Sequence, residues 1–419
     1  MRRTYLPDSF AILLALTLLT AGVVAHGETP QSSQDGAKQE LTNAVANDED
    51  SAQQQTQRIQ MAILLDTSNS MDGLINQARG QLWKIVNEFA TAKGPNGQLP
   101  DFEVAVFEYG NNSLDEAGGH LRMVTPFTDD LDLVSRDLFN LTTNGGQEYC
   151  GHVLQSALAK LEWSPSDDDL KLVFIAGNEP FTQGTVDPYE MAQQAIQRGI
   201  TVNTIFCGAQ AEGINTGWQK GAVLADGSFI NIDQNAAAVA IETPQDKRLA
   251  ELSEKINTTY VFFGTDDERR ERKSLQQGQD QAARRGGRGV AASRATAKAG
   301  RLYRAQDFDL ASAVKSGDIK LEDIKPDMLP EELRDKSQEE IAKYLEEKLA
   351  ERAKIQEEIA KLSVEREKFI AEASAANGDA DGDTLQSAVL KAVHDQAARK
   401  NINFDKQNQG SGGNDSGKK

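Results

Sequence analysis

Positive charge is scarce in this sequence. Its 419 residues include 45 lysines and arginines against 64 aspartates and glutamates, so the formal net charge is −19 at pH 7. Binding to nucleic-acid phosphates depends on a basic surface that releases counterions. The composition therefore argues against DNA or RNA as a partner, and the short arginine- and glycine-rich cluster at residues 284–289 is interpreted as a hinge.

Long hydrophobic runs are absent beyond the N-terminus, so we expect no membrane span in the mature chain. Arg2 and Arg3 precede an almost unbroken apolar stretch over residues 10–25, which is typical of an export signal. The stretch is short for a membrane span of about 20 residues. We therefore expect residues 1–25 to be a cleaved signal peptide and the protein to be exported to the periplasm or the cell exterior. An uncleaved membrane anchor is the alternative.

Cysteine is limited to Cys150 and Cys207. An even number of cysteines in an exported chain is typical of a disulfide. The sequence leaves the pairing open, and two buried free thiols are the alternative.

Histidine is limited to four residues, and we find no nucleophile with a matching base, no carboxylate pair and no cofactor loop in a supporting context. The spacing of Cys150 and His152 points their side chains to different sides of a helix. We interpret His152 as a structural histidine. The sequence therefore does not predict an enzyme.

Three segments lack the apolar residues of a packed element. Residues 26–57 are rich in Gln, Asp, Ser and Asn, which predicts a disordered linker. Residues 265–300 are charged and then rich in Arg, Gly and Ala with no apolar period, so we expect a second linker there. Residues 405–419 are interpreted as a disordered tail.

Alternating strands and helices are predicted between residues 58 and 264. Short runs rich in apolar and β-branched residues alternate with segments of helical period, which is typical of a mostly parallel central sheet with helices on both faces. A further strand over residues 120–126 is expected at an edge, antiparallel to its neighbour, and residues 217–233 are expected to add a helix and a strand. The apolar runs lie at residues 60–65, 102–109, 170–176, 201–207 and 260–263.

A helical segment is predicted over residues 301–404, with one long helix at residues 337–375. Its apolar residues trace a partial heptad stripe that Lys348, Arg352 and Arg366 interrupt. The stripe is compatible with a coiled coil that oligomerises, with a solvated helix, or with a helical hairpin packed on its own chain.

Asp66, Ser68 and Ser70 lie on a short polar loop directly after the first predicted strand. One carboxylate and two hydroxyls are ligands that a hard cation such as Mg²⁺ prefers. The alternative is that this turn only caps the helix that follows. The loop matches the Asp-x-Ser-x-Ser loop of the von Willebrand factor type A family, and residues 58–264 resemble a bacterial exported branch of that family.

The resemblance implies two further metal-binding positions. The family has a threonine after a Gly-Gly pair, and here Gln147 takes its place, so Gln147, Glu148 and Thr143 are the candidates. The family also has an aspartate after the fourth strand, where this chain has Gly177. Asn178 or Glu179 are the possible substitutes.

The family resemblance implies a Rossmann-like sheet of strand order 3-2-1-4-5-6, with the site at the topological switch point. It places Cys150 and Cys207 at the ligand-binding edge, where a disulfide would brace the loops. It implies a non-enzymatic adhesion or scaffold module that binds a protein ligand through a divalent cation, Mg²⁺ or Mn²⁺. The alternatives are a metal-independent scaffold with a degenerate site and a metal-dependent hydrolase.

Overall fold

The computed structural model describes residues 56–232, 241–376 and 385–404. The predicted signal peptide, the predicted tail and nearly all of the linker predicted for residues 26–57 lie outside these residues. No helix in the described ranges combines the length and the apolar character needed to cross a bilayer.

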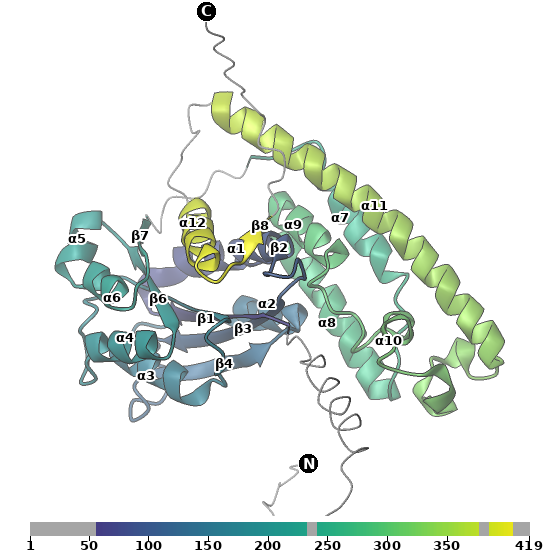
Figure 1. Ribbon diagram of the computed structural model, residues 1–419, viewed down its shortest axis with the longest axis horizontal. Helices are drawn as coiled ribbons and strands as arrows, with labels where there is room; N and C mark the ends of the chain where they lie inside the picture. Colours follow the sequence, from purple (N-terminus) through teal and green to yellow (C-terminus); the bar gives the residue numbers. More distant parts are fainter. Residues whose placement is uncertain (1–55, 233–240, 377–384, 405–419) are drawn as a thin grey trace, which may run out of the picture. The chain divides into compact units, whose positions relative to one another are not determined.

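A six-stranded sheet forms the centre of the molecule (Figure 1). The strands are β1 (Arg58–Asp66), β3 (Asp101–Tyr109), β4 (Leu121–Thr128), β5 (Leu170–Gly177), β6 (Ile200–Cys207) and β7 (Phe229–Ile232). Their order is β4-β3-β1-β5-β6-β7, and all pairs are parallel except β3 with β4. Numbered along the chain this is 3-2-1-4-5-6, which confirms the predicted fold of the von Willebrand factor type A kind. The run at residues 260–263 is not a sheet strand, since Phe262 forms only an isolated bridge with Asp309.

Both faces of the sheet are covered by helices, because successive side chains of a strand point to opposite faces. On β1, Met61 and Leu65 pack into one apolar cluster, whereas Ala62 and Leu64 pack into the other. Helices α1 (Asp72–Phe89), α2 (Leu131–Asn140) and α12 (Leu385–Ala398) cover the first face. Helices α3 (Cys150–Lys160), α4 (Pro188–Gln197) and α6 (Trp218–Leu224) cover the second (Figure 1).

Helix α12 belongs to the sheet domain although it follows a long helical region. The side chains of Asn203 on β6 and Gln396 on α12 exchange two buried hydrogen bonds of 3.1 and 2.7 Å. The strands β2 (Ala92–Lys93) and β8 (Asn403–Phe404) pair antiparallel beside them. Helix α12, which follows residues 241–376 in the chain, therefore packs on the same sheet as residues 58–232.

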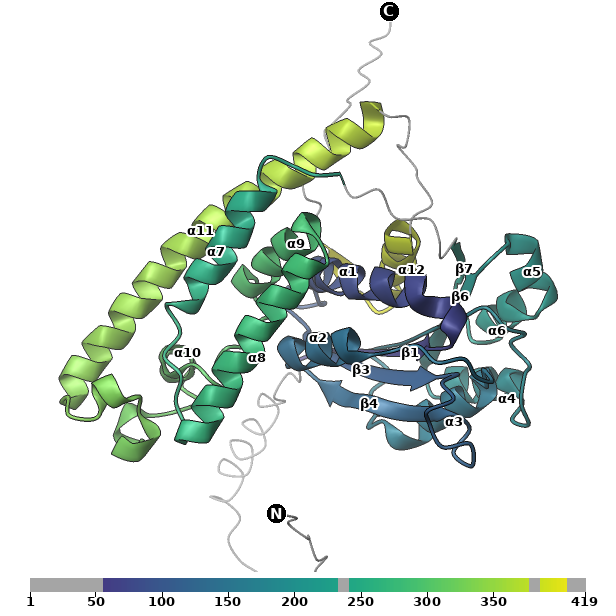
Figure 2. The same ribbon diagram turned by 180° about the vertical axis from the view of Figure 1, so that it is seen from behind.

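Residues 265–300 form two packed helices, which corrects the predicted linker. They are α8 (Asp266–Arg285) and α9 (Arg288–Ala299), and the figures show both beside α2 and α1 (Figures 1 and 2). A capping box of Thr265 and Glu268 starts α8. The buried side chains of these helices are alanines and hydrogen-bonded polar residues. Such residues give no apolar period, and the composition therefore suggested a linker.

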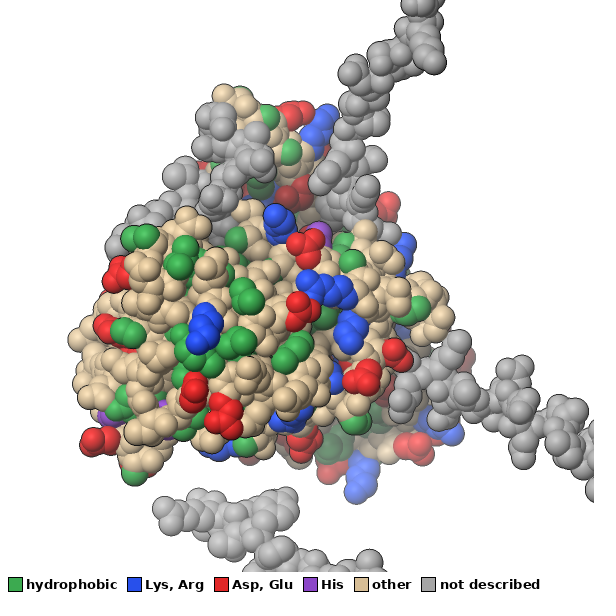
Figure 3. All heavy atoms as spheres, turned by 60° about the vertical axis from the view of Figure 1, so that its left-hand side comes forward, with side chains coloured by type: hydrophobic (Ala, Val, Ile, Leu, Met, Phe, Trp, Pro, Cys, Tyr) green, Lys and Arg blue, Asp and Glu red, His purple; other side chains and the backbone are tan. Residues whose placement is uncertain are grey.

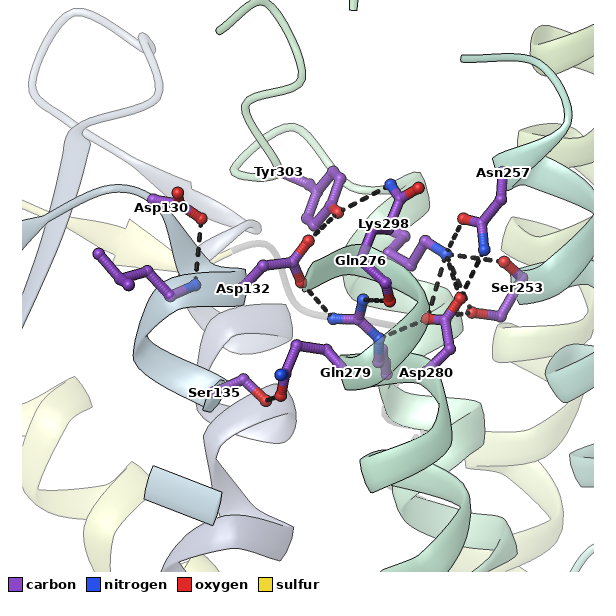
Figure 4. Close-up of polar contacts among 12 residues, drawn as sticks. Asp130, Asp132, Ser135, Ser253, Asn257, Gln276, Gln279, Asp280, Lys298 and Tyr303 are labelled. Carbon is purple, nitrogen blue, oxygen red and sulfur yellow. Dashed lines mark hydrogen bonds and ion pairs between the residues drawn. The ribbon is translucent and has the colours of Figure 1, made fainter. Parts of the chain in front are cut away.

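A buried network of charges joins α8 and α9 to the sheet domain (Figure 4). Arg294 donates to Asp132 on α2 and to Asp280 on α8, both at 2.6 Å, and its guanidinium lies 4.7 Å from the centre of the Trp83 ring. Lys298 donates to the same Asp280 carboxylate at 3.1 Å. Buried charges are stable where each is paired and hydrogen-bonded, as these are.

Helix α11 (Gln338–Ala376) packs on its own chain. Its stripe residues Ile355 and Ile359 are buried in a cluster with α7 (Asp246–Asn257) and α9. Two of the residues that interrupt the stripe are buried ion-pair partners: Arg352 donates to Asp309 at 2.7 Å and Arg366 donates to Asp246 at 2.8 Å. The buried part of the stripe thus packs on the same chain, whereas its residue Phe369 near the end of α11 is exposed.

The remaining elements are short. They are α5 (Gln210–Asn215), α10 (Leu310–Ser316), and the 3-10 turns Asn69–Met71, Leu321–Asp323, Pro326–Met328 and Glu331–Leu333.

Candidate functional site

The candidate site lies at the carboxyl end of the parallel strands, between β1 and β5. These strands are neighbours in the centre of the sheet, and β1 ends at Asp66 while β5 ends at Gly177. The chain leaves them toward opposite faces, so their ends form the topological switch point at which ligands bind in open α/β sheets. The Asp66 loop therefore lies at the switch point of this sheet.

The Asp66 loop holds its polar side chains against one another. The buried Asp66 carboxylate accepts a hydrogen bond from the Ser68 backbone N–H at 2.7 Å and from the Ser68 hydroxyl at 3.2 Å. The hydroxyls of Ser68 and Ser70 lie 3.0 Å apart, and the Asn178 side-chain amide donates to the Ser70 hydroxyl at 3.1 Å. The residues at the start of the following helical turns make no side-chain cap. Helix capping therefore does not explain why the loop has these residues.

Glu148 is the candidate from the second loop that the structure brings to Asp66. A Cβ built on Gly110 would lie 2.5 Å from Asp66 Oδ1 and 2.9 Å from Glu148 Cγ, so both acidic side chains border the same small space. Glu148 is only 3% exposed, and its carboxylate accepts from the Glu179 backbone N–H at 3.3 Å. Burial, and next the adjacent Glu148 carboxyl, raise the pKa of Asp66 well above its usual range.

The other two candidates from this loop make contacts elsewhere. Gln147 is exposed, and its side-chain oxygen accepts from the Tyr149 hydroxyl. The hydroxyl of Thr143 donates to Asp72 at the start of α1 at 2.6 Å. Glu148 is thus the second-loop residue placed to act with Asp66.

Glu179 contributes mainly through its backbone. Its N–H orients Glu148, and its carbonyl accepts from the Trp218 indole at 2.8 Å. Its carboxylate is exposed at the rim, where partial burial and then the charges of Glu148 and Glu212 raise its pKa.

Figure 3 shows the side of the molecule that carries α4, α5 and α6, where acidic side chains are interspersed with hydrophobic and basic ones.

The position of the expected aspartate is closed. A Cβ on Gly177 would lie 2.6 Å from the Tyr109 hydroxyl and 3.0 Å from the Trp218 ring. The Tyr109 hydroxyl donates to the Ala176 carbonyl at 2.9 Å, which keeps the ring in this place. No sequence signal linked Tyr109 and Trp218 to the site, because they reach it from β3 and α6.

The set of side chains is chemically suited to a hard cation. Across the described residues, no group of three or more His, Cys, Asp or Glu side chains is arranged to hold a metal. The site instead offers two buried carboxyl groups and two hydroxyls, and the adjacent Glu148 carboxyl helps to raise the pKa of Asp66. Carboxyl and hydroxyl oxygens are ligands that fit Mg²⁺ or Mn²⁺.

Both cysteines are buried free thiols, which corrects the predicted disulfide. Cys150 packs with Leu64 and Trp218 on one face of the sheet, whereas Cys207 packs with Leu65 on the other. The sheet lies between the two sulfur atoms, so they do not form a bridge.

Comparison with known proteins found similarity to solved structures only, since no family model and no curated protein matches the chain. Proximal thread matrix protein 1 from the mussel byssus is 17% identical, with a TM-score of 0.29, over 38% of this chain and 39% of that chain. BatB from Bacteroides thetaiotaomicron is 15% identical, with a TM-score of 0.32, over 42% of this chain and 90% of that chain. The SpRpn10 VWA domain is 13% identical, with a TM-score of 0.33, over 43% of this chain and 91% of that chain. The chain spans about two fifths of the length of the mussel protein it matches.

Proposed function

We propose that the chain is an exported protein-binding module of the von Willebrand factor type A kind, which holds Mg²⁺ or Mn²⁺ at the carboxyl edge of its sheet. Asp66, Ser68, Ser70 and Glu148 would hold the cation. The observation that supports this proposal most directly is the position of Glu148, a buried carboxyl group that borders the same space as Asp66 and forms no salt bridge among the described residues.

A bound cation would neutralise the two carboxylates and offer a coordination position to an oxygen atom of a protein partner. The chain's own residues prepare the site for it. Backbone N–H groups of Ser68 and Glu179 fix the orientation of the Asp66 and Glu148 carboxylates. Asn178 fixes the Ser70 hydroxyl. Because these groups are already oriented, binding loses little side-chain freedom.

The proposed role is non-enzymatic. Burial raises the pKa of the Cys150 thiol, so the reactive thiolate is disfavoured. Burial lowers the pKa of His152, whose ring contacts Tyr149 and Thr185 and not the Asp66 loop. A metal-independent scaffold is the second candidate, and the closure of the third ligand position at Gly177 favours it.

Isothermal titration of residues 26–419 with Mg²⁺ and with Mn²⁺ tests the metal site. The whole mature chain is needed because α12 completes the sheet domain. We expect the parent to bind the cation and Asp66→Ala to abolish this binding. Glu148→Gln should weaken the affinity for the cation at least about tenfold, which corresponds to roughly 1.4 kcal/mol. Asp101→Asn is the matched control, because Asp101 is an exposed carboxylate at the opposite end of β3. Absence of binding by the parent to either cation would favour the metal-independent scaffold.

Capture of partners from the native envelope fraction tests the protein-binding role. We expect partners to be retained in Mg²⁺ and released by a chelator, and Asp66→Ala to retain none. Partners that stay bound in chelator and on the Asp66→Ala variant would contradict a metal-dependent contact.

A further inference from the structure

A cleft of about 700 Å³ lies within the inserted helical region, in a different part of the chain from the Asp66 loop. It is framed by the end of α7, by α8 and by the first turns of α11, whose arrangement can be followed in Figures 1 and 2. Ligand sites for small molecules have volumes of about 300–1,000 Å³. The cleft therefore has the size of a small-molecule site.

The wall formed by α8 is polar along its length. Lining residues recur at helical spacing, at Arg270, Lys273, Gln277 and Gln281, and all four are exposed. Helices that face other parts of their own chain usually present apolar residues to them. Helix α8 instead leaves an open space lined by hydrogen-bonding groups.

The facing wall is aromatic. Phe262 and Tyr344 line the cleft and are half-buried, so part of each ring is free to contact a ligand. Tyr260 also lines the cleft, and its ring centre lies 6.4 Å from that of Phe262. Rings held in this way offer rigid apolar surface at little cost in conformational entropy.

Ion pairs within the protein account for most of the lining acids. Asp280 is paired with Arg294 and Lys298, and Glu254 is paired with Arg284. Asp266 is paired with Arg269 and with Arg334. Glu332 is the lining acid without a salt bridge among the described residues.

Two cations of the α8 wall remain available. Among the described residues Arg270 pairs only with Asp267, whose side chain is 92% exposed, and such a surface pair is easily exchanged. Lys273 has no salt bridge in the described part of the chain. Arg270 and Lys273 lie one turn apart, so both can reach one acidic group.

We propose that this cleft binds an amphiphilic anion, a small molecule with an apolar body that contacts Phe262 and Tyr344 and an acidic group that pairs with Arg270 and Lys273. This binding is independent of the metal site, since it involves none of the same residues.

Fluorescence titration of residues 26–419 with 8-anilinonaphthalene-1-sulfonate, an aromatic anion, tests the proposal. We expect saturable binding to one site, and binding about tenfold or more weaker in an Arg270→Gln/Lys273→Gln variant, because two charge-assisted contacts are lost. The control is Arg285→Gln/Lys361→Gln, which removes the same charge at two exposed positions outside the cleft. This control should bind as the parent does.

An uncharged probe separates loss of charge from loss of shape. N-phenyl-1-naphthylamine should bind equally to the parent and to the Arg270→Gln/Lys273→Gln variant, whereas Tyr344→Ala should weaken both probes. Thermal melting by circular dichroism checks that each variant is folded. The proposal is overturned if the folded parent shows no saturable binding of the anionic probe. It is also overturned if the control variant loses as much affinity for this probe as the Arg270→Gln/Lys273→Gln variant does, or if the latter loses affinity for both probes equally.

Discussion

The hydroxyl oxygen of Tyr109 lies 2.6 Å from the position that a Cβ on Gly177 would occupy. That hydroxyl and the aspartate implied by the family resemblance exclude one another sterically. The absence of an aspartate after β5 is therefore part of a packed arrangement that also includes the Trp218 ring. Glu148, which approaches Asp66 from the second loop, supplies the second carboxylate of this site.

Replacement of Gly177 by alanine should reveal this packing. We expect Gly177→Ala to lower the free energy of unfolding by about 1–3 kcal/mol, because the new methyl group overlaps the Tyr109 hydroxyl. Tyr109→Phe should cost about 1 kcal/mol through the lost hydrogen bond to Ala176. The double variant should cost clearly less than the sum, since the overlapping hydroxyl is gone. Urea denaturation of the four proteins measures this coupling, and strict additivity would show that the two sites do not interact.

The raised pKa of Asp66 predicts how stability depends on pH without a cation. An acid whose pKa is higher in the folded state than in the unfolded state binds more protons when folded, so its contribution to stability is present below the unfolded value of 3.8 and is lost as pH rises through the folded value. We therefore expect the metal-free protein to lose stability as the pH rises from 3.8 to the raised pKa of Asp66 in the folded protein. Asp66→Asn removes the ionisable group with little change in shape, so it should flatten this dependence and be more stable than the metal-free parent at pH 7.

Addition of Mg²⁺ should reverse the order of these two proteins. A cation that binds the ionised carboxylates stabilises the parent by mass action and leaves Asp66→Asn nearly unchanged. Thermal melting at several pH values, with and without Mg²⁺, measures both effects. A parent that gains stability as pH rises without a cation would contradict the electrostatic basis of the site.

Removal of Arg294 should destabilise the protein strongly. This fully buried guanidinium pairs with Asp132 and Asp280, and Arg294→Met leaves Asp132 without its cation and Asp280 with Lys298 alone. We expect a loss of about 3–5 kcal/mol. Arg272→Met is the matched control, because its salt bridge to Asp130 is partly exposed and should contribute less than about 1 kcal/mol. Equal effects of the two variants in urea denaturation would show that the buried network does not hold the helices to the sheet.

Local features of the sequence predicted the sheet and the start of the site. The position of Asp66 at the end of an apolar run predicted its place at the carboxyl end of the first strand. The helices α8 and α9 could not be predicted in this way, because Arg294 finds Asp132 across 162 positions of the chain. The burial of Arg352 within the heptad stripe could not be predicted either, because its ion-pair partner Asp309 lies on another segment of the chain. Residues whose burial depends on a distant partner have the same local pattern as solvated ones.

The cysteines should be unreactive in the native protein. Cys150 and Cys207 are both buried, and burial raises the pKa of each thiol. We expect no labelling by a thiol reagent under native conditions and two labelled thiols per chain in denaturant. Mass spectrometry of unreduced peptides should detect both as free thiols. A Cys150–Cys207 bridged peptide would contradict their placement on opposite faces of the sheet.

The sheet domain should require its C-terminal helix. The buried residues Val389 and Val393 of α12 belong to the same apolar cluster as α1 and β1, and Gln396 satisfies the buried Asn203 side chain. A chain that ends at residue 376 lacks these contacts and exposes to water the part of this face that α12 covers, which costs several kcal/mol at about 25 cal/mol per Å² of apolar surface. We expect it to aggregate or to melt without a cooperative transition. A chain that ends at residue 404 should melt as the parent does. Cooperative melting of the shorter chain near the parental temperature would instead show that α12 is not required for folding.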